Sequence, residues 1–257
     1  CMIYLSKPEK SNFKKLLMKY LELIMVKNEN RLIFIQSKKI DILLDIIKDS
    51  DTDIYTIKKC LKIMSKLFKT NKNENIELFN TINIMDYSKM MFNIIINNIN
   101  IISIIKYATY ILSITLQSIE QNLIINEIIK INLIPIILEI IEKEEDTEAL
   151  YNCLRILSDI AMNENDDYSQ KFIEANGLEI IKKTLNIDYD DINIQIREES
   201  SLIISKIAAG NSEQRNKLIE EEYYPILYNI IKDEEESKVK INCLYAIYNF
   251  SILKNHQ

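Results

Sequence analysis

The chain has 257 residues, of which 47% are hydrophobic, and this is enough apolar material to bury a sizeable core. It contains only two Gly and three Pro residues, and its apolar residues recur at helical spacing without the alternation of strands, so the sequence predicts an all-α protein. The longest uncharged stretch, roughly Met90 to Ile105, is shorter than the ~20 residues of a membrane-spanning helix and contains four Asn, which excludes such a helix.

The net charge of −6 is unevenly distributed along the chain. Up to Tyr110 there are 18 Lys and Arg against 11 Asp and Glu, a net charge of +7. From Ile111 onward there are 14 against 27, a net charge of −13. Such a division can orient a protein against a charged surface or partner, although it also fits helix faces that are simply solvated.

Five segments of the chain share one pattern, in which a small residue is followed by apolar residues at helical spacing, commonly with Ser in the sixth place. They begin at Cys60, Ala108, Cys153, Ser200 and Cys243. Their starts lie 43 to 48 residues apart, the period of HEAT and armadillo repeats. A fainter copy begins at Leu17.

The residues between these segments predict further helices. Pro135 and Pro225 occupy the same place in their repeats, and proline fits the first turn of a helix. Asn211, with Gln214 three residues later, resembles a capping box at the start of a short helix. Each repeat is therefore predicted to contain one short, one medium and one long helix.

The stretch from Ile207 to Ile231, IAAGNSEQRNKLIEEEYYPILYNII, resembles the armadillo repeat. It has the end of a long helix, AAGN, a short helix, an acidic turn, a proline and a second helix. One such repeat cannot bury its own apolar face, so stacking of neighbours supplies the core. The resemblance implies a right-handed superhelical solenoid, with about five to six repeats in one domain over residues 1–257.

The residue types that usually support catalysis or metal binding are poorly placed. Cys60, Cys153 and Cys243 fall at equivalent places of different repeats, too far apart for a disulfide or a shared metal, and they are predicted core residues. The single histidine, His256, stands alone near the end of the sequence, and the two glycines are isolated. We therefore expect no enzyme activity, no cofactor, no metal site and no small-molecule substrate.

In armadillo proteins the long third helix of each repeat lines a concave groove. Transport receptors of the importin-alpha type carry Trp and Asn four residues apart on that helix, whereas this sequence has no Trp and fills the Asn place only at Asn249. This departure disfavours a nuclear-import mechanism. The predicted protein-binding residues at the matching places are Lys62, Lys66, Tyr110, Arg155, Lys206, Tyr245 and Asn249, unless they are ordinary solvent-facing residues. Charge reversal at Lys62 and Lys66 is expected to weaken binding with little effect on stability.

Nucleic acid is a weaker candidate partner. A basic cluster that includes Lys58, Lys59 and Lys69 could meet phosphate, but the sequence pI is about 5.1 and the acidic second half would repel it. We therefore expect no nucleic-acid partner.

The first functional hypothesis is a scaffold or adaptor. In size and repeat-only organisation the chain resembles the armadillo-repeats-only proteins of rhoptries, secretory organelles of parasitic protists. That resemblance implies a myristoylated and palmitoylated N-terminus that holds the protein at the cytosolic face of an organelle membrane, and repeats that recruit a myosin motor to position the organelle. The sequence lacks a Met-Gly start, so such an anchor is expected in an upstream segment.

The alternatives are a cargo-binding transport or chaperone-cofactor adaptor, or a structural protein of cilia or the cytoskeleton. Basic residues of the first helix region predict peripheral contact with an anionic membrane: Lys7, Lys10, Lys14, Lys15 and Lys19. At the other end, Tyr245, Tyr248 and Phe250 predict an apolar edge open to a partner or to a second copy of the chain.

Overall fold

The computed structural model describes residues 11–37, 40–49, 51–68, 79, 82–143, 145–163, 166–187 and 193–252. All regular secondary structure within these ranges is α-helical, which confirms the predicted all-α class. In the same part of the chain, no helix has both the length and the apolar character needed to cross a bilayer. Cys1, Lys7, Lys10, Lys69, His256 and the side chains of Lys14 and Lys15 lie outside the description.

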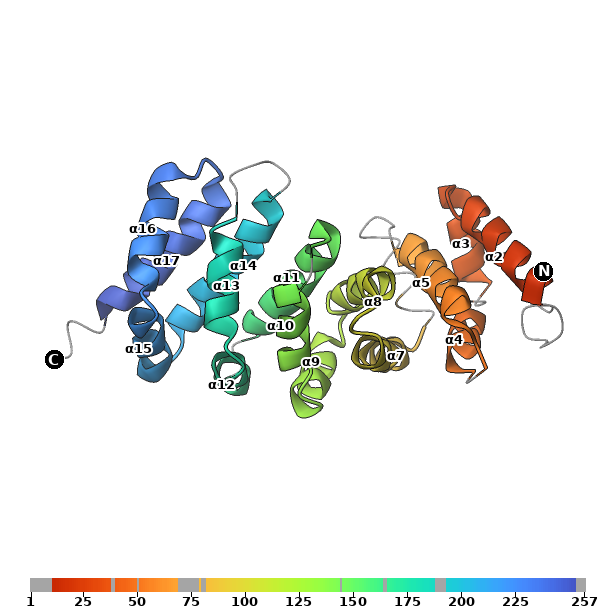
Figure 1. Cartoon of the computed structure of the whole chain (residues 1–257), viewed down its shortest axis with the longest axis horizontal. Helices are drawn as coiled ribbons and strands as arrows, with labels where there is room; N and C mark the ends of the chain where they lie inside the picture. The colour runs from red at the N-terminus through yellow and green to blue at the C-terminus, as the bar shows by residue number, and fades with distance from the viewer. Residues whose placement is uncertain are drawn as a thin grey trace. The chain divides into compact units, whose positions relative to one another are not determined.

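The chain divides into two compact units, Cys1–Ile124 and Ile125–Gln257, with the boundary inside one helix (Figure 1). The helices of the first unit are α2 (Ser11–Ile24), α3 (Asn28–Gln36), α4 (Asp41–Lys48), α5 (Ile54–Phe68), α7 (Ile84–Asn97) and α8 (Ile102–Thr115). The boundary helix is α9 (Gln121–Lys130). The second unit continues with α10 (Ile134–Lys143), α11 (Thr147–Ala161), α12 (Asp166–Glu174), α13 (Gly177–Leu185), α14 (Ile194–Ala209), α15 (Ser212–Glu220), α16 (Tyr223–Asp233) and α17 (Ser237–Ile252). The prediction of one domain with five to six repeats stays a prediction.

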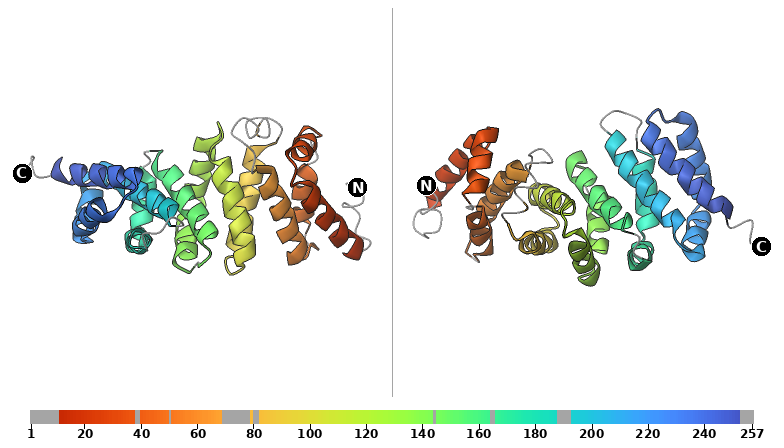
Figure 2. Two further views of the ribbon diagram at one scale, coloured as in Figure 1. Left: turned by 90° about the horizontal axis from the view of Figure 1, so that it is seen from above. Right: turned by 180° about the vertical axis from the view of Figure 1, so that it is seen from behind.

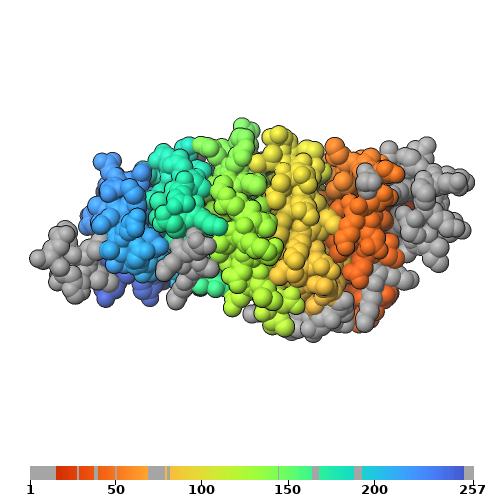
Figure 3. Space-filling view, turned by 90° about the horizontal axis from the view of Figure 1, so that it is seen from below, coloured from red at the N-terminus to blue at the C-terminus, as the bar shows by residue number. Residues whose placement is uncertain are grey.

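In the repeats that can be compared, two shorter helices precede one long helix. The helices of α15–α16–α17 have 9, 11 and 16 residues, which is the predicted order of short, medium and long. In α12–α13–α14 the lengths are 9, 9 and 16 residues, and in α3–α4–α5 they are 9, 8 and 15, so the second helix, still called medium below, is no longer than the first. Helix α2 is the long helix of the fainter copy that begins at Leu17. In the space-filling view, the cyan and blue repeats of the second unit follow one another as neighbouring bands (Figure 3).

Successive long helices pack against one another within each unit. Helix α5 contacts both α2 and α8 in the first unit, and α14 contacts both α11 and α17 in the second (Figure 2). The small residue that leads each pattern lies inside this packing, since Cys60, Cys153 and Cys243 are all fully buried. Their predicted role as core residues is thereby confirmed, and burial raises the pKa of the Cys243 thiol to about 12.

The recurrent Ser of the pattern also has a structural role. The hydroxyl groups of Ser65 and Ser113 each donate a hydrogen bond to the carbonyl oxygen three residues earlier, at 2.9 and 2.8 Å. A short side chain that satisfies its hydroxyl on its own helix allows the next long helix to approach closely. This explains why the same residue type returns from repeat to repeat.

The helix junctions of the second unit show two local features, a capping box and a recurring left-handed residue. Asn211 begins α15 with the predicted capping box, in which its side chain accepts from the Gln214 amide at 3.0 Å and Gln214 reaches back to the Asn211 amide at 3.2 Å. Before α10, α13 and α16, one residue adopts the left-handed conformation: Asn132, Asn176 and Glu222, with φ of 58°, 60° and 56°. Pro135 lies in the first turn of its helix, as predicted.

A buried ion pair connects the last two repeats of the second unit. The Arg197 guanidinium on α14 donates to the Glu234 carboxylate, with Nε 2.6 Å from Oε2, and both side chains are almost fully buried. Glu234 also accepts from the backbone amides of Glu235 and Glu236, ahead of α17. The pair therefore joins the first turn of one long helix to the N-terminus of the next.

Candidate functional site

The candidate surface is formed by equivalent positions on successive long helices, because these positions project away from the small residues buried between the helices. Two positions four residues apart recur on each helix, and we name them the first and second columns. The first column holds Lys62, Tyr110, Arg155, Leu202 and Tyr245, and the second holds Lys66, Ile114, Asp159, Lys206 and Asn249. The predicted binding residues all belong to these columns.

In the first unit, three lysines of α5 converge on one residue of α2. The Nζ atoms of Lys59 and Lys62 lie 2.6 Å from the two carboxylate oxygens of Glu22. Lys66 Nζ donates to the Glu22 carbonyl oxygen at 2.9 Å, in the last turn of α2 where carbonyls lack helical partners. The structure thus brings Lys62 and Lys66 together, but around an internal partner.

This cluster changes the ionisation of its members. Burial alone would raise the pKa of Glu22, but hydrogen bonds from Lys59 and Lys62 outweigh it and hold the pKa at about 2. The pKa of Lys62 is raised by its bond to Glu22, whereas burial lowers the pKa of Lys66. A charge reversal at either lysine would therefore disturb the packing of α2 on α5, which revises the expectation that stability would be unaffected.

Tyr110 also has an internal contact. Its hydroxyl group lies 3.5 Å from the carbonyl oxygen of Phe68, at the end of α5. The side chain is half-buried on α8, and its ring leaves part of its surface to solvent. The three predicted residues of the first unit therefore contribute to joining long helices, in addition to any partner they contact.

In the second unit, Arg155 is brought beside two carboxylates. Asp159 follows it by one helical turn on α11, and Glu199 projects from α14 and accepts a hydrogen bond from the Ser158 hydroxyl. The Oδ2 atom of Asp159 is buried and has no hydrogen-bond partner among the described residues. Burial raises the pKa of Asp159 to about 7, with a contribution from Glu199, although Arg155 opposes the shift.

The remaining predicted residues lie on the next two long helices of the second unit. Lys206 is half-buried in the last turn of α14. Tyr245 is exposed on α17, and Asn249 follows it by one turn and is half-buried. Because α14 packs on both α11 and α17, the columns of these three helices make a continuous surface of mixed charge with an exposed aromatic ring.

Two residues of the surface were not among the predictions. Glu22 was missed because its lysine partners lie 37 to 44 residues later in the sequence, although a single acid opposite lysines at helical spacing was a usable signal. Glu199 was missed because it lies one place before the small residue Ser200, a position that the pattern treats as variable. Within the described ranges, no three His, Cys, Asp or Glu side chains come together as a metal site would require.

Comparison with solved structures identifies the repeat type. A designed armadillo repeat protein is 20% identical, covers 97% of this chain and 98% of its own, and has a TM-score of 0.71. A computationally designed armadillo repeat protein for modular peptide recognition is likewise 20% identical over 97% and 98% of the two chains, with a TM-score of 0.72. The fold is the armadillo-repeat solenoid.

A third solved structure contains a bound peptide. It is a designed armadillo repeat protein in complex with the peptide (KR)4, 20% identical over 97% of each chain, with a TM-score of 0.67. No protein-family model matches the sequence, and no curated protein matches it. The likeness to these solved structures shows the fold of this chain.

Proposed function

We propose that the protein is a non-enzymatic scaffold that binds an extended segment of a partner protein along its long-helix columns. The observation that carries the proposal is the regular surface of α11, α14 and α17, where equivalent positions recur from helix to helix. An extended peptide has a repeating backbone, so side chains presented at regular intervals can meet successive residues of it. The peptide-bound designed relative supports this mode of binding.

For the second unit we propose a basic partner segment. The chain from Ile111 onward carries a net charge of −13, and the buried Oδ2 of Asp159 is an acceptor without a donor. Tyr245 offers an exposed ring on which a Lys or Arg side chain can stack. A guanidinium that reached Asp159 would supply the missing hydrogen bond and favour the ionised carboxylate.

Fluorescence anisotropy with a labelled peptide of alternating Lys and Arg tests this proposal. We expect binding that weakens with salt and strengthens as the pH rises from about 6 to about 8, because Asp159, with its pKa of about 7, loses its proton over that range. The variant Asp159→Asn should remove most of the pH dependence, and Tyr245→Ala should weaken binding several-fold.

The matched controls are an acidic peptide of equal length and the variant Asp233→Asn, which alters an exposed carboxylate away from the columns. Equal affinity for the acidic peptide would contradict a basic partner. Retention of full affinity in an Asp159→Asn, Tyr245→Ala and Asn249→Ala triple variant would place the binding surface elsewhere.

At a finer level, we propose that the scaffold works at the cytosolic face of an organelle membrane and holds a motor protein or other effector there. Its support is the resemblance to the repeat-only rhoptry proteins and the net charge of +7 up to Tyr110. Basic residues near an anionic leaflet contribute about 1 kcal/mol each, so this attraction alone is reversible, and stable attachment requires acylation upstream.

Co-sedimentation with vesicles tests the membrane contact. The chain should bind vesicles that contain phosphatidylserine at low salt and should leave them at high salt. Lys19→Glu, which reverses an exposed charge on α2, should reduce binding, and Lys130→Glu serves as a control on another helix. Equal binding to neutral vesicles, or no binding to anionic ones, would contradict an electrostatic contact.

A further inference from the structure

We propose that the chain associates head to tail with a second copy of itself, through an apolar face of α17 on one copy and an apolar face of α2 on the other. This inference goes beyond the proposed peptide binding and rests on other observations, although Tyr245 belongs to both surfaces, and its test therefore leaves Tyr245 unchanged. It starts from α17, where Ile241, Leu244, Tyr245 and Tyr248 follow one another at helical spacing and line a shallow exposed depression. An amphipathic helix normally buries such a face.

Comparison with equivalent positions shows what kind of surface this is. Leu244 is 53% exposed, whereas its equivalents Leu154 and Ser201 on the two preceding long helices are fully buried. Those residues lie on the side that the next long helix covers, since the Asn242 amide on α17 donates to the Ser201 hydroxyl at 3.0 Å. The exposed face of α17 is therefore the surface on which a further long helix would stack.

The exposure of Tyr248 also indicates that this face of α17 is one on which a further long helix would stack. It is 64% exposed, while its equivalents Ser158 and Ser205 are buried. In the medium helices, Tyr224 is exposed although its equivalents Ile134 and Leu178 are buried. Leu178 is covered by the next repeat, whose Tyr223 hydroxyl donates to its carbonyl oxygen at 2.5 Å. Both α16 and α17 thus present surfaces that inner repeats bury against a neighbour.

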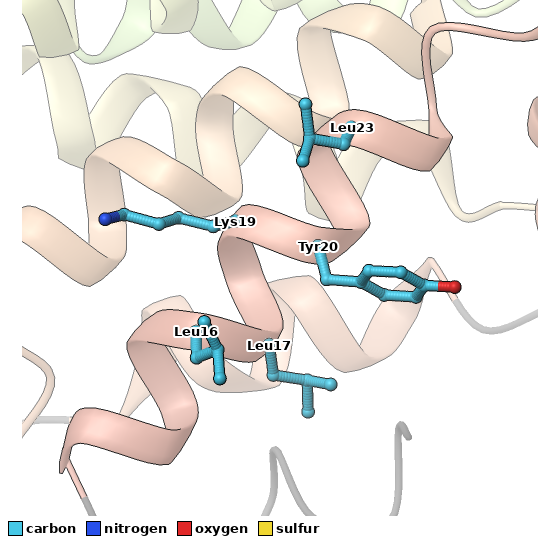
Figure 4. A pocket seen from close by; sticks show the side chains of 5 residues that line it. All are labelled: Leu16, Leu17, Lys19, Tyr20 and Leu23. Atoms are coloured by element: carbon cyan, nitrogen blue, oxygen red, sulfur yellow. The ribbon is translucent and has the colours of Figure 1, made fainter.

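The complementary surface is on α2. Leu16, Tyr20 and Leu23 are exposed along one side of this helix, and with Lys19 and Leu17 they line a shallow apolar depression (Figure 4). Tyr20 is 56% exposed, although its equivalents in the other long helices are fully buried: Ile63, Ile111, Ile156, Ile203 and Ala246.

Alignment of α2 with α5 shows which neighbour the exposed side of α2 would contact. Leu16, Lys19 and Leu23 are equivalent to Lys59, Lys62 and Lys66, the residues through which α5 contacts the preceding helix. They therefore form the side of α2 that a preceding long helix would contact. The exposed side of α17 is the one that a following long helix would contact, so α17 of another copy can take the place of that preceding helix. In that register Lys19 meets the tyrosines of α17, and an ammonium group near a tyrosine ring is favourable.

Charge favours the same pairing. The first repeat, residues 11–48, has eight basic and four acidic residues, whereas the last, residues 212–252, has five basic and eight acidic residues. Pairing of unlike ends is attractive, and pairing of like ends is not. Because the contact joins two different surfaces, each assembly retains one free face of each kind, and association can continue beyond a dimer.

Sedimentation velocity on the 257-residue chain tests the proposal up to concentrations on the order of 500 µM, because contacts smaller than a standard interface bind weakly. One variant, Leu16→Glu with Leu23→Glu, blocks the α2 face, and a second, Leu244→Glu with Tyr248→Glu, blocks the α17 face. Circular dichroism checks that both remain helical. The control is Ile119→Glu at a residue that is 98% exposed and belongs to neither face.

We expect the parent chain and the Ile119→Glu variant to grow in mass with concentration beyond a dimer. Each blocked variant alone should remain a monomer, and an equimolar mixture of the two should form a 1:1 dimer and nothing larger. A monomeric parent would overturn the proposal, as would dimerisation of the α2-blocked variant alone, which would indicate a symmetric contact through α17. Growth that Ile119→Glu abolishes would indicate non-specific association and would also overturn it.

Discussion

The two units use the same columns of the long helices in different ways. In the first unit, one carboxylate, Glu22, is surrounded by Lys59, Lys62 and Lys66, and its pKa falls to about 2. In the second unit, burial raises the pKa of Asp159 to about 7, Glu199 adds to the shift and Arg155 opposes it. Basic partners outweigh burial at Glu22 and do not outweigh it at Asp159, so the first acid joins helices while the second keeps an acceptor atom that a partner can reach.

The largest loss of stability is expected at the buried ion pair between Arg197 and Glu234 in the second unit. Replacement of Arg197 by Met leaves the Glu234 carboxylate buried without its partner, and should reduce the free energy of unfolding by about 3–5 kcal/mol. Urea denaturation followed by circular dichroism measures the change. The double variant Arg197→Met and Glu234→Leu removes the unpaired charge and should recover part of the loss. A single variant within about 1 kcal/mol of the parent would show that the pair is not needed.

The next largest effect is expected at the lysine cluster. Glu22→Gln removes the negative charge that three lysines share and should cost about 1–3 kcal/mol. Since the folded pKa of Glu22 is depressed, its contribution is present above the unfolded pKa of about 4.5 and is lost as the pH falls toward about 2. Denaturation at several pH values should therefore show a loss in this acidic window that the variant lacks. The control is Glu29→Gln, an exposed residue of α3.

The opposite sign is expected at Asp159. Its folded pKa is raised, so the folded state binds a proton more tightly than the unfolded state, and stability falls as the pH rises from about 4 to about 7. Asp159→Asn should flatten this part of the profile and stabilise the protein at pH 8 by on the order of 1 kcal/mol. Asp233→Asn is the matched exposed control. Loss of stability at pH 8 in Asp159→Asn would show that the carboxylate has a partner that favours its ionised form.

The fold could be predicted from the sequence because repetition averages out local ambiguity. A single segment such as the one at Cys60 fits many helices, but five copies at 43 to 48 residues specify the repeat and the small buried residues. The capping box at Asn211 was visible because both of its residues lie within one turn. Features that depend on three or four neighbouring residues could therefore be predicted from the sequence alone.

The candidate site was less predictable, because its chemistry is set by contacts between repeats. The column positions of Lys62 and Arg155 followed from the pattern, but their surroundings did not. Glu22 reaches Lys59 across 37 residues, and Glu199 reaches Ser158 across 41. Spacing within one helix does not show which side chain of the previous repeat stands opposite, so the internal pairing of the lysines was missed by an analysis that treated each repeat by itself.

The smallest expected effect concerns the turn before each medium helix, where the second unit offers an internal comparison. Asn132, Asn176 and Glu222 occupy the same place with φ near 60°. Asn tolerates this left-handed conformation through its short polar side chain, whereas Glu has no such local compensation. Glu222→Asn should therefore stabilise the protein by about 0.5–1 kcal/mol, which corresponds to about 1–4 °C in the melting temperature.

The reciprocal variant provides the control for this prediction. Asn176→Glu places the unfavourable residue in the neighbouring repeat and should destabilise by a similar amount, so the double variant should melt close to the parent. Because the two sites lie in different repeats, their effects are expected to add. Differential scanning calorimetry of the parent, the two single variants and the double variant measures both changes in melting temperature. If Glu222→Asn leaves the melting temperature unchanged while Asn176→Glu lowers it, then contacts of the Glu222 side chain offset the cost of its backbone conformation.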